Sequence, residues 1–236
     1  MTQTVAFEKF KTGINGFLSD CMPSCSGIQK NRVFSYDICR KHFAHPLSEN
    51  KDVDAVYLFA FLSSWGMLRN TGLMSISPCG LTNTIDVIYE TFEYFKDNDI
   101  FSIKDEEISD FVGNFEKIAD GLDKDKISSS NTMVSKIILG VWGSIPALDT
   151  NFNKAFGFYP TTKIEKVICE LREAFENIKK TDVSIIHKHL FKPYLNLELE
   201  YYGMPKLVDM YGFYVGLKKR KDEYYLSEQQ TLFSNI

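Results

Sequence analysis

The residues most able to do chemistry lie in a few short stretches of this sequence. His187-Lys-His189 places two imidazoles one residue apart, a spacing that two ligands of one metal ion can have. Cys21 and Cys25 bracket a proline-containing turn and could supply two thiolates. A zinc site needs further ligands, and no acidic or cysteine cluster close in the sequence completes either pair. We therefore expect no metal ion and no cofactor.

Arg40 and His45 are separated by four residues, the Arg-x4-His spacing of HEPN-type ribonucleases. A histidine there could move a proton while the arginine stabilises a phosphorane. In that family the motif comes late in the helical domain, whereas here it comes early. The spacing also occurs on ordinary helix surfaces, and we assign no ribonuclease activity from it.

A more specific pattern runs from Asn131 to Phe156. An apolar helix, NTMVSKIILGVWG, is followed by SIPALDTNFNKAF. Within the second part, residues 148–152 give an apolar residue, Asp-Thr, a polar residue and another apolar residue. In order and spacing this stretch resembles the helix-hairpin-helix DNA base-excision glycosylases, the endonuclease III-like superfamily.

The resemblance implies that Asp149 is catalytic. The family's aspartate lies at a helix N-terminus beside a cleft between two helical lobes, where it stabilises positive charge on the sugar of a flipped nucleotide. Residues 127–131, which correspond to the DNA-binding hairpin, contain no glycine. The lysine nucleophile of bifunctional members corresponds to Asn131, so the resemblance implies a monofunctional hydrolase. Asn131 and Lys136 are then the candidate DNA-contacting residues, with DNA as the partner.

Two tryptophans and one arginine are the candidate pocket residues. Trp65 or Trp142 could line the pocket for the flipped base, and Arg69 could reach a polar cavity. Gly66, next to Trp65, predicts a close helix crossing. Together with Ser135-Lys136 and Pro146-x-x-Asp149, the stretch Ser64–Arg69 also resembles a group of bacterial proteins of unknown function.

A simpler interpretation of Asp149 is structural. Asp-Thr after a proline-containing turn is a common helix N-cap. The chain would then be a non-enzymatic protein whose helical surface binds a protein partner. Whether it is an enzyme therefore stays open in the sequence, and exposure of Asp149 in a cleft would favour the enzyme.

Apolar residues at helical spacing predict an all-α, single-domain protein over residues 1–236. A possible lobe boundary lies in the polar stretch 120–130. The segments around Tyr57–Phe61 and Met133–Trp142 are apolar on every face, which predicts two central helices that bury Leu58, Phe61, Ile137, Ile138 and Val141. We expect helices at about 5–19, 30–44, 53–68, 85–95, 105–119, 133–142, 164–178 and 205–219, a short helix that starts near Asp149, and at most one short strand, near 194–200.

The overall composition favours a cytoplasmic protein. The net charge of −4 gives no general attraction to a phosphate backbone. The basic run at 218–221 is interpreted as a solvated end of the last helix. No secretory signal opens the chain and no apolar stretch is long enough to cross a membrane, so we expect no membrane partner. The five cysteines are an odd set without repeated spacing, which predicts free thiols.

Overall fold

The computed structural model describes residues 4–21, 32–44, 50–69, 72–180, 187 and 202–233. All regular structure in these ranges is helical, which confirms the predicted fold class. The strand expected near 194–200 lies outside the described residues. The α-helices are α1 (Phe7–Cys21), α2 (Arg32–Ala44), α3 (Lys51–Ser64), α4 (Thr82–Asp97), α5 (Ile108–Lys124), α6 (Asn131–Val141), α7 (Thr150–Phe156), α8 (Ile164–Ala174), α9 (Glu176–Lys179) and α11 (Met204–Phe233). Three short 3-10 turns are η1 (Leu73–Ser75), η2 (Pro78–Gly80) and η3 (Asp105–Glu107).

Helix α6 is the centre of the core. Every residue from Met133 to Val141 is buried, so the predicted burial of Ile137, Ile138 and Val141 is confirmed. The helix packs against α2, α3 and α5. A Cβ atom on Gly140 would lie only 2.4 Å from the ring of Phe61, so glycine permits the close crossing of α3 and α6.

The prediction that Gly66 marks this crossing is wrong. Gly66 follows the end of α3 with a positive φ of 78° and has nothing within 4 Å of its Cβ position. It reverses the chain after α3, a conformation that glycine adopts without steric cost. A short-range pattern could not distinguish this turn glycine from Gly140, because the crossing depends on a helix far away in the sequence.

Helix α3 is not central. Its inner face buries Leu58 and Phe61 as predicted, but its outer face is exposed although it is apolar. An all-round apolar helix usually indicates burial on every side. Among the described elements, α2, α4, α6 and η2 pack against it, and Val53, Val56 and Tyr57 on its outer side are exposed.

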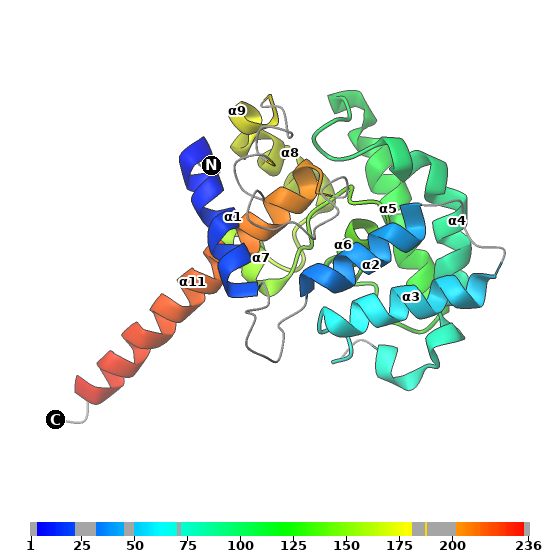
Figure 1. Cartoon of the computed structure of the whole chain (residues 1–236), viewed down its shortest axis with the longest axis horizontal. Helices are drawn as coiled ribbons and strands as arrows, with labels where there is room; N and C mark the ends of the chain where they lie inside the picture. Colours follow the sequence, from blue (N-terminus) through cyan, green and yellow to red (C-terminus); the bar gives the residue numbers. More distant parts are fainter. Residues whose placement is uncertain are drawn as a thin grey trace.

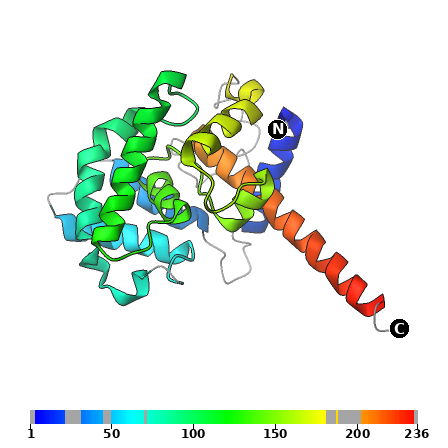
Figure 2. The same cartoon turned by 180° about the vertical axis from the view of Figure 1, so that it is seen from behind.

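The first and last helices lie together on one side of the molecule (Figure 1). Helix α11 packs against both α1 and α7, and its C-terminal half extends away from the other helices, as Figure 2 shows from behind. The predicted end at 219 is wrong, because α11 continues to Phe233. Two residues of the basic run bind α7 instead of ending the helix: Lys219 donates to the carbonyl of Ala155 and Arg220 to the side chain of Asn151.

The buried apolar side chains form one cluster that extends from α1 to α11. The predicted boundary at 120–130 covers the last residues of α5 and the turn before α6, and these two helices pack against each other. Within the described ranges, none of the helices combines the length and the apolar character that crossing a membrane requires.

Candidate functional site

Asp149 occupies the N-cap position of α7. Its backbone is extended (φ −81°, ψ 176°), and its Oδ1 accepts a hydrogen bond of 2.9 Å from the backbone N–H of Phe152. The capping role predicted from the sequence is therefore confirmed. The side chain is half-exposed, but it does not line either of the hollows around Trp142 described below.

Asn131 begins α6 close to the loop before α8. Its side-chain amide donates to the carbonyl oxygens of Pro160, at 3.2 Å, and Thr162, at 2.9 Å. The next residue, Thr132, donates to the carbonyl of Leu148. The start of α6 is thus tied to the loops on either side of α7, and Asn131 uses its amide to hold two protein segments together.

Lys136, the second candidate DNA contact, is buried in the core with only 4% of its surface exposed. Its Nζ donates to the carbonyl oxygen of Trp65, at 2.7 Å, and lies 3.2 Å from Sδ of Met67. Its ammonium therefore stabilises the C-terminal end of α3 and is not placed on a surface that a phosphate could reach.

The three candidate pocket residues do not come together. Trp65 is the C-cap of α3, where its indole N–H donates to Oγ of Ser35 and its ring packs on Phe61. Arg69 is exposed beyond that helix end. Trp142 follows the end of α6 and lines two hollows beside α2 and α4.

Two adjoining hollows meet at Trp142. The larger, about 360 Å³, lies between α2 and α4, and the smaller, about 160 Å³, continues toward the end of α4. Both share three side chains: Arg40, Lys96 and Trp142. Arg40 also donates through Nη1 to the carbonyl of Val141 at the end of α6. The arginine that reaches a hollow is therefore Arg40 of α2, whereas the sequence pointed to Arg69.

The open side of α3 forms an apolar stripe. Val53, Val56, Tyr57 and Ala60 recur at intervals of three or four residues and are all exposed, with Val53, Val56 and Tyr57 at 39%, 44% and 38%. Ile38 on the neighbouring α2 is 57% exposed. We call these five residues the α3 face. The apolar character of these residues can be read from the sequence, but their exposure depends on which side of α3 packs against α6.

A buried carboxylate holds α2, α3 and α4 together under the α3 face. Asp54 is 1% exposed, its Oδ1 lies 2.7 Å from Nε2 of His42, and its Oδ2 accepts a hydrogen bond of 2.6 Å from the hydroxyl of Tyr89. Burial and this hydrogen bond raise the pKa of Tyr89. The imidazole of His42 stacks on Tyr57, with ring centroids 3.8 Å apart. This cluster was not predicted, because its members are far apart along the chain.

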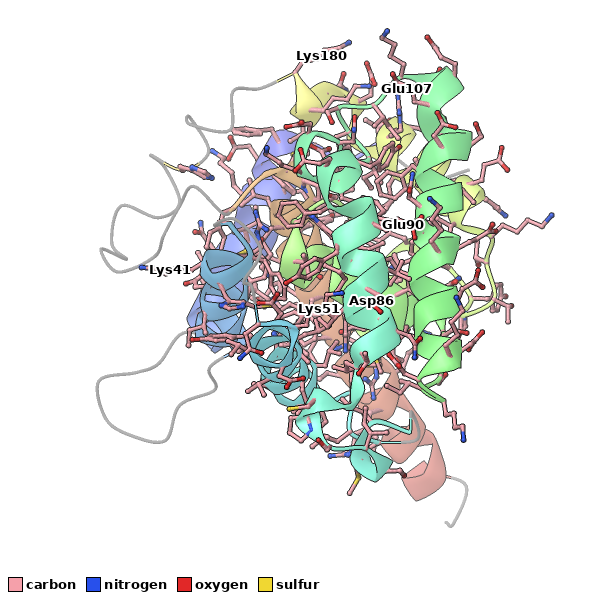
Figure 3. All side chains as sticks on the ribbon, turned by 90° about the vertical axis from the view of Figure 1, so that its right-hand side faces the viewer. Lys41, Lys51, Asp86, Glu90, Glu107 and Lys180 are labelled. Atoms are coloured by element: carbon pink, nitrogen blue, oxygen red, sulfur yellow. The ribbon has the colours of Figure 1, made fainter. Side chains whose placement is uncertain are left out.

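Ion pairs reinforce the same junction. Lys51 of α3 and Asp86 of α4 lie side by side on the surface (Figure 3) and form a salt bridge. Glu90, one turn further along α4, accepts from Lys117 of α5 at 2.8 Å. These pairs are exposed, so each contributes at most about 1 kcal/mol; one links α3 to α4 and the other links α4 to α5.

A second buried ion pair lies at the start of α11. Lys206 and Asp209 are almost fully buried, with Nζ and Oδ2 2.8 Å apart. The Lys206 ammonium lies 4.5 Å from the ring centroids of Tyr36 and Trp65, and Asp209 accepts from the backbone N–H of Ala147. This pair was not predicted, although two opposite charges three residues apart in an apolar helix are a usable signal.

The remaining chemical candidates are only partly described. His187 bonds through Nε2 to the carbonyl oxygen of Tyr202, whereas His189 and His45 lie outside the described residues. Cys39, Cys79 and Cys169 are free thiols; Cys25 lies outside the described residues and the side chain of Cys21 is not described. No group of three or more His, Cys, Asp or Glu side chains in the described part of the chain could hold a metal ion.

Comparison with known proteins adds no assignment: no protein-family model, curated protein or solved structure matches this chain.

Proposed function

We propose that this chain is a non-enzymatic interaction module that binds an amphipathic helix of a partner protein on the α3 face. The observation that supports this function is the exposure of Val53, Val56 and Tyr57 on a helix whose other side is in the core. Contiguous apolar surface on a folded protein marks a site of association, because covering it removes apolar area from water.

The spacing of the stripe favours a helical partner. Positions 53, 56, 57 and 60 repeat at 0, 3, 4 and 7, which is the pattern by which one helix packs along another. The surface is also held in place before binding, since Asp54 and His42 lock α3 to α2 and α4. A preformed surface binds with less loss of conformational entropy. Exposed charges at Lys41, Lys51 and Asp52 provide a polar rim.

The size of the α3 face favours one helix over a second copy of the chain. A stable dimer buries about 800 Å² on each partner, and five partly exposed side chains fall well short of that area. A single helix laid along α3 matches the length of the stripe. The expected complex is therefore a one-to-one complex with a short helical segment.

A helical-peptide selection tests this function. Peptides with apolar residues at positions 0, 3, 4 and 7 are displayed as a library and selected on the full chain. We expect the selected peptides to bind the Val53→Lys/Val56→Lys variant at least about tenfold more weakly, a loss of about 1.4 kcal/mol. The matched control is Tyr159→Lys, which changes an exposed aromatic residue elsewhere, and should bind like the wild type.

Two outcomes would reject the proposal. One is that selected peptides bind the double variant as well as the wild type, or no better than scrambled peptides do. The other is a wild-type dimer in sedimentation equilibrium that the double variant converts to a monomer, which would assign the α3 face to a second copy.

A glycosylase-like hydrolase is the second candidate function. It is supported by the sequence resemblance and by the half-exposed carboxylate of Asp149 at the start of α7. Incubating the chain with duplexes that carry alkylated, oxidised or deaminated bases tests it directly. Absence of base release and of duplex binding at low salt would reject this candidate.

A further inference from the structure

The imidazole of His42 lies directly behind the α3 face. It stacks on the ring of Tyr57, with ring centroids 3.8 Å apart and an interplanar angle of 8°. Its side chain is 17% exposed, and Ile38, the member of the α3 face on α2, lies one helical turn before it. A helix laid across Ile38 and Tyr57 therefore covers His42 and removes its remaining contact with water.

His42 bonds to a carboxylate that the fold has removed from water. Asp54 is 1% exposed, and its two oxygens contact Nε2 of His42 and the hydroxyl of Tyr89. Because a carboxylate only accepts hydrogen bonds, Nε2 of His42 carries the hydrogen, and a further proton goes to Nδ1. With a neutral imidazole the cluster carries the negative charge of Asp54. With a protonated imidazole it is a neutral ion pair.

The other charged side chains near this cluster are paired, bonded to the backbone or exposed. On α4 and its neighbours they form three salt bridges: Lys51–Asp86, Lys96–Glu93 and Lys117–Glu90. The charged residue of α6, Lys136, donates to the end of α3. Lys41 and Asp52, close to the cluster in the sequence, are exposed. The carboxylate of Asp54 is therefore the buried charge that a proton on His42 neutralises.

Covering the α3 face changes the balance between these two charge states. Removing water raises the free energy of a cluster with a net charge more than that of a neutral, hydrogen-bonded ion pair. The bond between an imidazolium and a carboxylate also strengthens in less polar surroundings. The covered face therefore favours the protonated imidazole. Histidine is the side chain whose charge ordinarily changes between about pH 5 and 8.

We propose that partner binding on the α3 face is regulated by pH, through a proton that His42 takes up when the partner helix binds. This regulation rests on the helix-binding function proposed above. Because the complex holds the proton more firmly than the free chain does, the affinity increases as the pH falls. With one proton taken up, the Kd changes by at most about tenfold per pH unit.

Selected peptides that contain no histidine, aspartate or glutamate and have blocked termini test the proposal, because such peptides do not titrate in this range. Calorimetry from pH 5.5 to 8.0 measures their Kd for the full chain. Measurements in two buffers of different ionisation enthalpy count the protons taken up per complex. We expect binding at least about threefold tighter at pH 5.5 than at pH 7.5, with a net uptake of protons.

Two substitutions assign the proton. His42→Gln keeps an N–H donor for Asp54 but cannot be protonated, so its peptide affinity should not depend on pH and its proton uptake should vanish. His187→Gln is the matched control, since Nε2 of His187 bonds to the carbonyl of Tyr202, a residue outside the α3 face. This variant should keep the pH dependence of the wild type.

The proposal is overturned if the peptides bind the wild type equally at both pH values, or more weakly at pH 5.5. It is equally overturned if His42→Gln, shown to be folded by circular dichroism, keeps the pH dependence. Should His42→Gln lose its fold, the wild-type proton count decides, and an uptake of zero overturns the proposal. Peptides that bind independently of pH reject the regulation alone. If no peptide binds at any pH, the helix-binding function is rejected and the regulation with it.

Discussion

The ammonium of Lys136 lies 2.7 Å from the carbonyl oxygen of Trp65, 71 residues earlier in the chain. Trp65 is the C-cap of α3, and the last carbonyl groups of a helix have no partner within it. A positive charge at that end also complements the helix dipole. Lys136 therefore joins the centre of α6 to the end of α3, which is the helix that carries the exposed α3 face.

Replacing Lys136 with Met tests this link. The methionine keeps most of the volume but leaves the Trp65 carbonyl without its donor, so we expect a loss of about 1–3 kcal/mol in the free energy of unfolding. Lys104→Met, on the surface, should change it by less than about 0.5 kcal/mol. Urea unfolding followed by circular dichroism measures both. Equal stabilities for the two variants would contradict the role given to Lys136.

A pair of glycine substitutions tests the crossing of α3 and α6. Gly140→Ala places a methyl group 2.4 Å from the buried ring of Phe61, and such overpacking typically costs about 1–3 kcal/mol. Gly113→Ala, at an exposed position of α5, meets nothing within 4 Å and should stabilise by about 0.5–1 kcal/mol, since alanine favours helix. Thermal unfolding of both should shift the midpoint in opposite directions. A stabilised Gly140→Ala would show that the two helices are further apart.

Substitutions at Asp149 distinguish a capping role of this residue from a catalytic role. Asn caps a helix about as well as Asp, whereas Ala costs about 1 kcal/mol. The free energy of unfolding of Asp149→Asn should match that of the wild type, and that of Asp149→Ala should be lower. If the chain is glycosylase-like, Asp149→Asn should also abolish base release from damaged duplexes, because only the anion stabilises a cationic sugar. Base release that persists in the Asn variant would remove Asp149 from the catalytic role.

Buried tyrosines predict a loss of stability at alkaline pH. Burial raises the pKa of Tyr36 and Tyr202 well above the ordinary value of 10.0, and raises the pKa of Tyr94 to about 12. Above pH 10 the unfolded chain releases these protons while the folded chain keeps them. Their contribution is therefore fully present below pH 10 and decreases above it, by up to about 1.4 kcal/mol per pH unit for each fully buried tyrosine.

Urea unfolding at pH values from 8 to 11.5 measures this decrease. Tyr36→Phe should reduce the slope above pH 10, since one buried hydroxyl is removed, whereas Tyr159→Phe, at an exposed position, should leave the slope unchanged. Absorbance at 295 nm should show buried tyrosines ionising only as the chain unfolds. A stability that stays level up to pH 11.5 would contradict the raised pKa values.

The positions of the helices could be predicted because their signals are local. The apolar run of α6 and the Asp-Thr start of α7 act through near neighbours in the sequence, so hydrophobic pattern and capping chemistry place these elements before any packing is known. The long α11 shows the limit of this approach. Its basic run resembles a helix end in isolation, but Lys219 and Arg220 bind groups of α7.

The candidate sites depend on contacts between distant parts of the chain, and single-sequence patterns do not contain them. Lys136 looks like a solvent-facing lysine until the end of α3 is placed beside it. The outer residues of α3, such as Val56, look like core residues until α6 covers only the opposite side. Arg40 and Trp142 share a hollow because α2 packs against the end of α6. Local residue types decide which segments form helices. Which faces of those helices stay exposed is decided by how the helices pack around their common core.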